Sequence, residues 1–139
     1  MKMMLLGLTA AIAMVAGGVS AQTPAVQAPQ TKAVVPLPSG MKQYWFVMLK
    51  KGPKRDQSAG EAEKLQAGHM ANIGSYAKSG QLQIAGPFGD DGDWRGIFIL
   101  DVADRAAAEK MCEDDPAVAA GRLACEIHPW WAQRGATLN

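Results

Sequence analysis

Residues 43–50, QYWFVMLK, have the composition of a β-strand and are apolar on both of their alternating sides. One side carries Tyr44, Phe46 and Met48, and the other carries Trp45, Val47 and Leu49. A strand that is apolar on both sides lies in a sheet that is covered on both faces. Helices can cover one of these faces, and a second layer is needed for the other.

The hydrophobic period changes from two to about 3.6 in residues 58–79, which predicts an amphipathic helix. Its apolar face carries Ala62, Leu65, His69, Ile73 and Tyr76. Glu61 follows Ser58 by three residues, the spacing of a capping box. Gly68 and Gly74 lie inside this helix, where each costs up to about 1 kcal/mol relative to alanine. Close packing, a nearby ligand or an irregular helix would each explain them.

The remaining segments complete an α+β pattern. Strands are predicted at 81–88 and 96–102, joined by a turn, followed by a helix over 104–115 and a last strand over 122–130. The order β-α-β-β-α-β is that of the ferredoxin-like fold. Helices cover only one face of such a sheet, so we expect a homodimer in which a second copy covers the other face and encloses a cavity.

The first 41 residues differ in composition from the rest. Residues 1–21 combine Lys2, an uncharged apolar run and the small residues Val19-Ser20-Ala21, which is typical of a secretory signal peptide. The apolar run is shorter than the roughly 20 residues of a membrane-spanning helix, although an uncleaved anchor is the alternative. Residues 22–41 are rich in proline and predict a linker. We therefore expect a periplasmic or secreted domain over residues 42–135.

The charge balance predicts neither a nucleic-acid partner nor a membrane partner after signal cleavage. The chain has 14 basic and 13 acidic residues, and removing Lys2 lowers the formal charge from +1 to zero. Nucleic-acid and anionic-membrane binding favour a clustered basic excess. The most basic stretch, KKGPKR at 50–55, is interpreted as a solvated loop, with a rim that steers anionic ligands as the alternative.

The chain resembles the YCII-related family over about residues 42–132. The resemblance rests on His69 early in the first helix, the Gly80–Pro87 run, and Asp115-Pro116 followed by Gly121. It implies a dimeric α+β barrel and a catalytic His–Asp pair. Gly86, in the Gly80–Pro87 run, is a candidate binding residue. Where family members often carry an arginine and an aromatic residue, this chain has Gln66 and Ala117.

His69 and Asp115 are the candidate catalytic residues. Imidazole gains and loses a proton near neutral pH, and a carboxylate on one ring nitrogen would direct the other nitrogen toward a substrate. Asp115 is the partner that the resemblance implies, and it precedes a proline that pushes it out of the helix. Asp114 is expected to be solvated. A purely structural His–Asp hydrogen bond is the alternative.

Two further polar residues lie on the last predicted strand. Glu126 and His128 alternate with Cys125 and Ile127, so they should face away from the helices, toward the cavity or the dimer interface. They are candidate binding residues. The alternative is that they satisfy each other at an interface.

The two cysteines bracket the Asp115-Pro116 turn. Export to an oxidising compartment and the predicted inward positions favour a Cys112–Cys125 disulfide over two buried thiols. Closing a loop of about 14 residues would stabilise the fold by roughly 3 kcal/mol in the chain-entropy model. The acidic turn at 90–93 lacks the ligand spacing of a calcium loop, and no metal or other cofactor is expected.

These features predict an enzyme that moves a proton on an unknown small molecule, of isomerase or lyase type. His69 would be the general acid/base and Asp115 its orienting partner. Two alternatives remain open: a non-catalytic periplasmic domain that binds a small ligand, and a structural dimeric domain in which the pair stabilises the fold.

Overall fold

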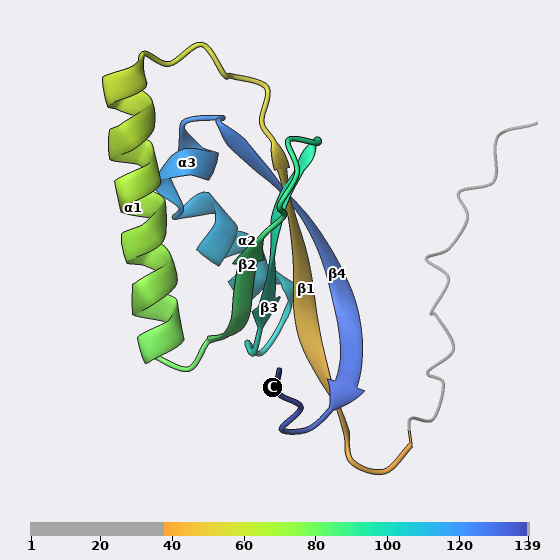
Figure 1. Ribbon diagram of the computed structural model, residues 1–139. Helices are drawn as coiled ribbons and strands as arrows, with labels where there is room; N and C mark the ends of the chain where they lie inside the picture. Colours follow the sequence, from red (N-terminus) through yellow and green to blue (C-terminus); the bar gives the residue numbers. More distant parts are fainter. Residues whose placement is uncertain (1–37, 139) are drawn as a thin grey trace, which may run out of the picture. The chain divides into compact units, whose positions relative to one another are not determined.

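The computed structural model describes residues 38–138. The predicted signal peptide and most of the predicted linker lie outside these residues. Figure 1 shows the elements in the order β1 (Met41–Lys51), α1 (Ala59–Lys78), β2 (Leu82–Pro87), β3 (Trp94–Leu100), α2 (Arg105–Glu113), α3 (Pro116–Ala119) and β4 (Leu123–Gln133).

The strands form one antiparallel sheet in the order β2-β3-β1-β4. This order, with helices between β1 and β2 and between β3 and β4, is the ferredoxin-like topology, which confirms the predicted α+β class. All three helices lie on one side of the sheet (Figure 1). Within residues 38–138, no helix is both long and apolar enough to cross a membrane.

The core lies between the sheet and the helices. Val47 is opposite Phe98 in β3 and Ile127 in β4, and this register places one alternating set of side chains against the helices. Val47 and Leu100 are the most deeply buried of the large apolar residues, at 0% and 1% exposure. The core residues are Trp45, Val47, Leu49, Leu82, Leu100, Ala108, Met111, Cys112 and Ile127.

The second predicted helix is followed by a short third helix that was not predicted. Residues 104–115 were expected to form one helix that stops before Pro116, and α2 spans Arg105–Glu113 with Asp104 as its N-cap. The four-residue α3 begins at Pro116. Asp115 lies between α2 and α3 with φ −75° and ψ 122°, an extended conformation. The proline that follows excludes Asp115 from the helical region, and this break turns the Asp115 side chain back as the cap of α3.

Helix α1 begins and packs as its sequence indicates. Ser58 and Glu61 form the predicted capping box. A Cβ on Gly68 would lie 3.0 Å from Cγ of Pro116, so the glycine allows α1 to pack closely on α3. A Cβ on Gly74 would meet nothing within 4 Å. Close packing therefore explains the first glycine and not the second.

Candidate active site

A cavity of about 390 Å³ opens between α1 and the sheet. Its walls come from α1, from β2 and β3, from the loop after β1, and from α3 with the segment that leads into β4. His69 on α1 and Phe98 on β3 both line it. The rings of these two residues are stacked, with centroids 5.9 Å apart and planes inclined by 24°.

His69 is held by Asp115, the N-cap residue of α3. Its Nδ1 lies 2.7 Å from Oδ2 of Asp115. The two residues are 46 positions apart in the chain, and they are only 7% and 3% exposed. The contact forms because α1 packs on α3 at Gly68, one residue before the histidine.

The two carboxylate oxygens of Asp115 have different partners. Oδ1 accepts hydrogen bonds from the backbone N–H groups of Ala117 and Val118, at 2.9 and 3.3 Å, and so caps α3. Oδ2 accepts from Nδ1 of His69 and, at 3.5 Å, from the side-chain amide of Asn72. The cap and the histidine contact together fix the orientation of the carboxylate.

This environment keeps Asp115 ionised. Burial raises the pKa of its carboxyl group, but hydrogen bonds from His69, Ala117 and Asn72 and the charge of the imidazole outweigh burial, so the net pKa is lowered. An ionised carboxylate can only accept hydrogen bonds, so Nδ1 of His69 carries the proton that it donates.

The other ring nitrogen of His69 is left available. Nε2 makes no hydrogen bond to a described residue, yet no buried side-chain nitrogen or oxygen among these residues lacks a partner. Nε2 is therefore reached by solvent. In the neutral ring it is unprotonated, which makes it a base at the wall of the cavity.

Of the other predicted site residues, Gly86 lines the cavity with His69. Asp114, which was expected to be solvated, is exposed and pairs with Lys110 at 2.9 Å, so it takes no part in the site.

Glu126 and His128 lie on the opposite face of the sheet from His69. They pair across β1 with Met48 and Phe46, whose side chains point away from the helices. Glu126 Oε1 lies 3.0 Å from His128 Nε2, and Lys50 donates to Glu126 Oε2 at 2.9 Å. The hydrogen bond and charge of Lys50, and then those of His128, lower the pKa of Glu126. These residues face away from the helices, as predicted, and they do not line the cavity beside His69.

A disulfide joins Cys112 in α2 to Cys125 in β4. It lies beside the site because Asp115 follows Cys112 by three residues and donates its backbone N–H to the Cys112 carbonyl at 3.1 Å. Within residues 38–138, no group of three or more His, Cys, Asp or Glu side chains could hold a metal ion.

Several residues of the site were not identified from the sequence. Asn72, which contacts Asp115, lies one turn after His69 on α1, a spacing that could have indicated it. Arg95 and Arg122 line the cavity with Arg55, the last residue of the basic stretch. Sequence spacing does not bring these three arginines together, because they come from the loop after β1, from β3 and from the segment before β4.

The described residues thus form a small ferredoxin-like α+β domain with a buried His–Asp pair beside a cavity. The chain belongs to the YCII-related family, whose domain model matches residues 45–131.

Among solved structures, the chain is similar to the 5-chloro-2-hydroxyhydroquinone dehydrochlorinase of Burkholderia phenoliruptrix, in complex with 2,5-dihydroxybenzoquinone. The two share 23% sequence identity, and the match covers 62% of this chain and 92% of the other with a TM-score of 0.45. No curated protein matches the chain.

Proposed function

We propose that this chain is a small-molecule enzyme of isomerase or lyase type in which His69 transfers a proton. The proposal rests on one observation: His69 donates from Nδ1 to Asp115 across 2.7 Å while its Nε2 is open at the wall of a cavity of about 390 Å³. A cavity of this volume is in the range that binds small organic molecules.

The proton moves in two steps. Nε2 of His69 removes a proton from an acidic C–H or O–H of the substrate, and the electron pair stays on the substrate. Asp115 stabilises the imidazolium that forms, without taking its proton. The imidazolium then returns the proton to another substrate atom in an isomerase, or to the leaving group in a lyase.

Turnover by two matched pairs of variants tests the proposal. The substrates are a library of hydroxylated aromatics, lactones and organic acids. His69→Gln should lower kcat by about 10²- to 10⁴-fold, the usual contribution of a general acid/base. His128→Gln removes the chain's other histidine, which is exposed on the opposite face, and should leave turnover unchanged. Equal rates in wild type and His69→Gln would rule out the proposed role.

Asp115→Asn tests the orienting role. Asparagine can keep the α3 cap through its amide oxygen, which leaves its NH₂ group facing Nδ1 of His69. That contact favours the tautomer with the proton on Nε2, so turnover should fall although the fold is kept. Asp114→Asn is the matched control, and it should have wild-type activity.

The two non-catalytic functions give different outcomes. A ligand-binding domain would bind a library compound unchanged, and His69→Gln would weaken binding only. A structural pair would show no ligand response, and His69→Gln would only lower the melting temperature.

We further propose that the domain is exported and forms a homodimer. The signal-peptide pattern of residues 1–21 supports export, as does the Cys112–Cys125 disulfide, because such bonds persist in oxidising compartments. The face of the sheet that lies opposite the helices carries apolar side chains, which supports the dimer. N-terminal sequencing of the protein recovered from its native host would test cleavage after residue 21.

A further inference from the structure

The cavity beside His69 carries positive charge without a matching carboxylate in its walls. Arg55, Arg95 and Arg122 line it, and no Asp or Glu does. The rest of the lining is mostly apolar, with Phe98 and Ile73 next to His69. A cavity with a mostly apolar lining and cationic side chains suits a ligand with an apolar body and an anionic group.

Two of the arginines have no anionic partner. Arg95 Nη1 lies 3.0 Å from Asp91 Oδ1 in the turn between β2 and β3. Arg55 donates to the backbone carbonyl of Arg122 at 3.0 Å, and Arg122 donates to the side-chain oxygen of Gln57 at 3.1 Å. Both of these acceptors are neutral. No carboxylate of residues 38–138 lies within ion-pair distance of Arg55 or Arg122.

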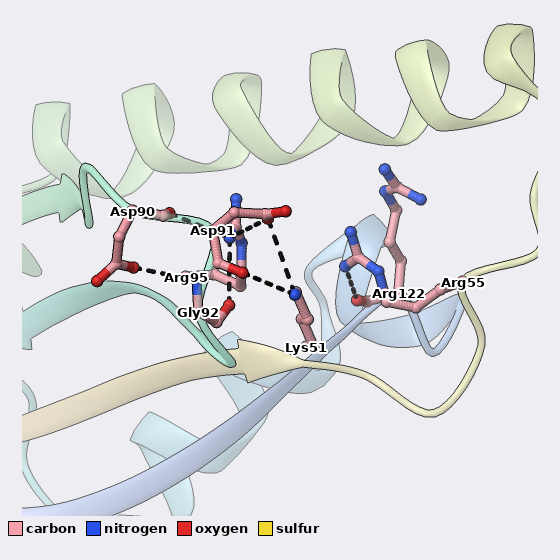
Figure 2. Close-up of polar contacts among 7 residues, drawn as sticks. All are labelled: Lys51, Arg55, Asp90, Asp91, Gly92, Arg95 and Arg122. Atoms are coloured by element: carbon pink, nitrogen blue, oxygen red, sulfur yellow. Dashed lines mark hydrogen bonds and ion pairs between the residues drawn. The ribbon is translucent and has the colours of Figure 1, made fainter.

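Figure 2 shows the two kinds of environment. Arg95 and Lys51 converge on Asp91, whereas Arg55 and Arg122 lie side by side below α1. The charge of Arg95 is thus partly neutralised by a 94% exposed carboxylate, and those of Arg55 and Arg122 are not neutralised by any carboxylate of residues 38–138.

The backbone places Arg55 and Arg122 together. Gly52 N–H donates to the Arg122 carbonyl and Lys54 N–H to the Gly121 carbonyl, both at 2.9 Å. A Cβ on Gly52 would lie 2.1 Å from the Gly121 oxygen, and Gly121 has a φ of +72°. Both glycines are therefore needed for this contact between the loop after β1 and the segment before β4.

We propose that Arg55 and Arg122 bind the carboxylate of a small organic acid, the substrate of this site. A planar guanidinium matches a carboxylate with two parallel hydrogen bonds, and two neighbouring guanidinium groups without an anionic partner in the lining of a cavity favour such an anion. The apolar body of the acid packs on Phe98, and its reacting proton faces Nε2 of His69. This assignment rests on the proposed function, because it takes the cavity beside His69 as the substrate site.

Benzoate and its neutral isostere benzamide are the probes. Binding to the full-length chain is measured by titration in solution NMR, for the wild type and for Arg55→Gln, Arg122→Gln and Arg134→Gln. Benzoate should bind the wild type at least roughly tenfold more tightly than benzamide. Arg55→Gln and Arg122→Gln should each lower the affinity for benzoate about tenfold, as expected for loss of one charge-assisted hydrogen bond.

Arg134→Gln is the matched control. It removes the same charge from an exposed position outside the cavity, so benzoate affinity should not change. Arg122→Lys keeps the charge without the planar fork, and its affinity should lie between those of wild type and Arg122→Gln. The melting temperature of each variant shows whether the loop contact is kept.

Three results would overturn the subsite: no benzoate binding, equal binding of benzoate and benzamide, or equal affinity in wild type and the Arg55 and Arg122 variants. Each of them leaves the proposed catalysis standing if turnover still depends on His69. Arginine-dependent benzoate binding without any His69-dependent turnover supports the subsite as a binding site and overturns the catalysis alone.

Discussion

At the residue scale, the site depends on the different partners of the two carboxylate oxygens of Asp115. One carboxylate oxygen caps α3 and the other orients His69, so a single side chain links local structure to the proposed chemistry. The link also makes the site sensitive to acid, because the same contacts that lower the pKa of Asp115 stabilise the fold.

The first prediction is that Asp115 makes the free energy of unfolding depend on pH in the acidic range. The pKa of its carboxyl group is lower in the folded chain than in the unfolded chain, where it is about 3.9. The stabilisation is therefore complete above that unfolded value and is lost as the pH falls through the folded value. Asp115→Asn should lower the free energy of unfolding at pH 7 by about 2 kcal/mol, the contribution of a hydrogen bond to a charged group.

Urea denaturation of wild type and Asp115→Asn at neutral and acidic pH measures this pH dependence. The difference between them should shrink as the pH falls below about 4. Asp114→Asn is the control, and its free energy of unfolding should be close to that of wild type because Asp114 is exposed. A difference between wild type and Asp115→Asn that does not change with pH would contradict the prediction.

Sequence reasoning reached part of the site at this scale. It identified His69 and Asp115 from a family resemblance, and the break at Pro116 gave a physical reason for Asp115 to turn inward. Asn72 was missed although its spacing from His69 on α1 could have indicated it. Arg95 and Arg122 were missed because their approach depends on how the strands and loops pack. Glu126 and His128 were placed on the correct face, but the cavity with His69 opens on the other.

At the element scale, α1 positions His69 through its packing on α3. The capping box at Ser58 and the end of the helix were predictable because they depend on a few adjacent residues. Helix α3 was not predicted because four residues show no hydrophobic period. The role of Gly68 also depends on α3, so the sequence left its explanation open.

The second prediction compares two alanine substitutions in α1. Gly74→Ala should raise the free energy of unfolding by up to about 1 kcal/mol, because the added methyl group meets open space and alanine favours the helix. Gly68→Ala should be less stable than wild type, because its methyl group would lie 3.0 Å from Cγ of Pro116 and displace α3. Chemical denaturation of both variants provides the comparison. Equal stabilisation by both would show that α1 does not pack closely on α3.

At the scale of the whole molecule, the sheet leaves one face without helices. Phe46, Met48, Ile97 and Ile99 lie on that face, as the register of β1 and β3 shows. The α+β topology was predictable because the alternation of periods along the chain determines the element order. The homodimer and the export stay predictions, since both concern what lies outside residues 38–138 of one chain.

The third prediction is that Met48→Lys disrupts the homodimer. A lysine at this position adds a charge to the apolar face opposite Ile97, and it lies next to Glu126, which can pair with it in the isolated chain. Sedimentation velocity should show a dimer for wild type and a monomer for the variant. Ala71→Lys adds the same charge on an exposed position of α1 and should remain dimeric. A wild-type monomer at all concentrations would contradict the predicted assembly.

The tautomer of His69 is the most direct test of the proposed site. In the His128→Gln variant His69 is the only histidine, so ¹⁵N NMR of the imidazole reports on it without ambiguity. At a pH where the ring is neutral, the account predicts a proton on Nδ1 and an unprotonated Nε2, and a change toward the Nε2–H tautomer when Asp115→Asn is added. A proton on Nε2 with Asp115 intact would contradict the account, because His69 would then have no free base facing the cavity.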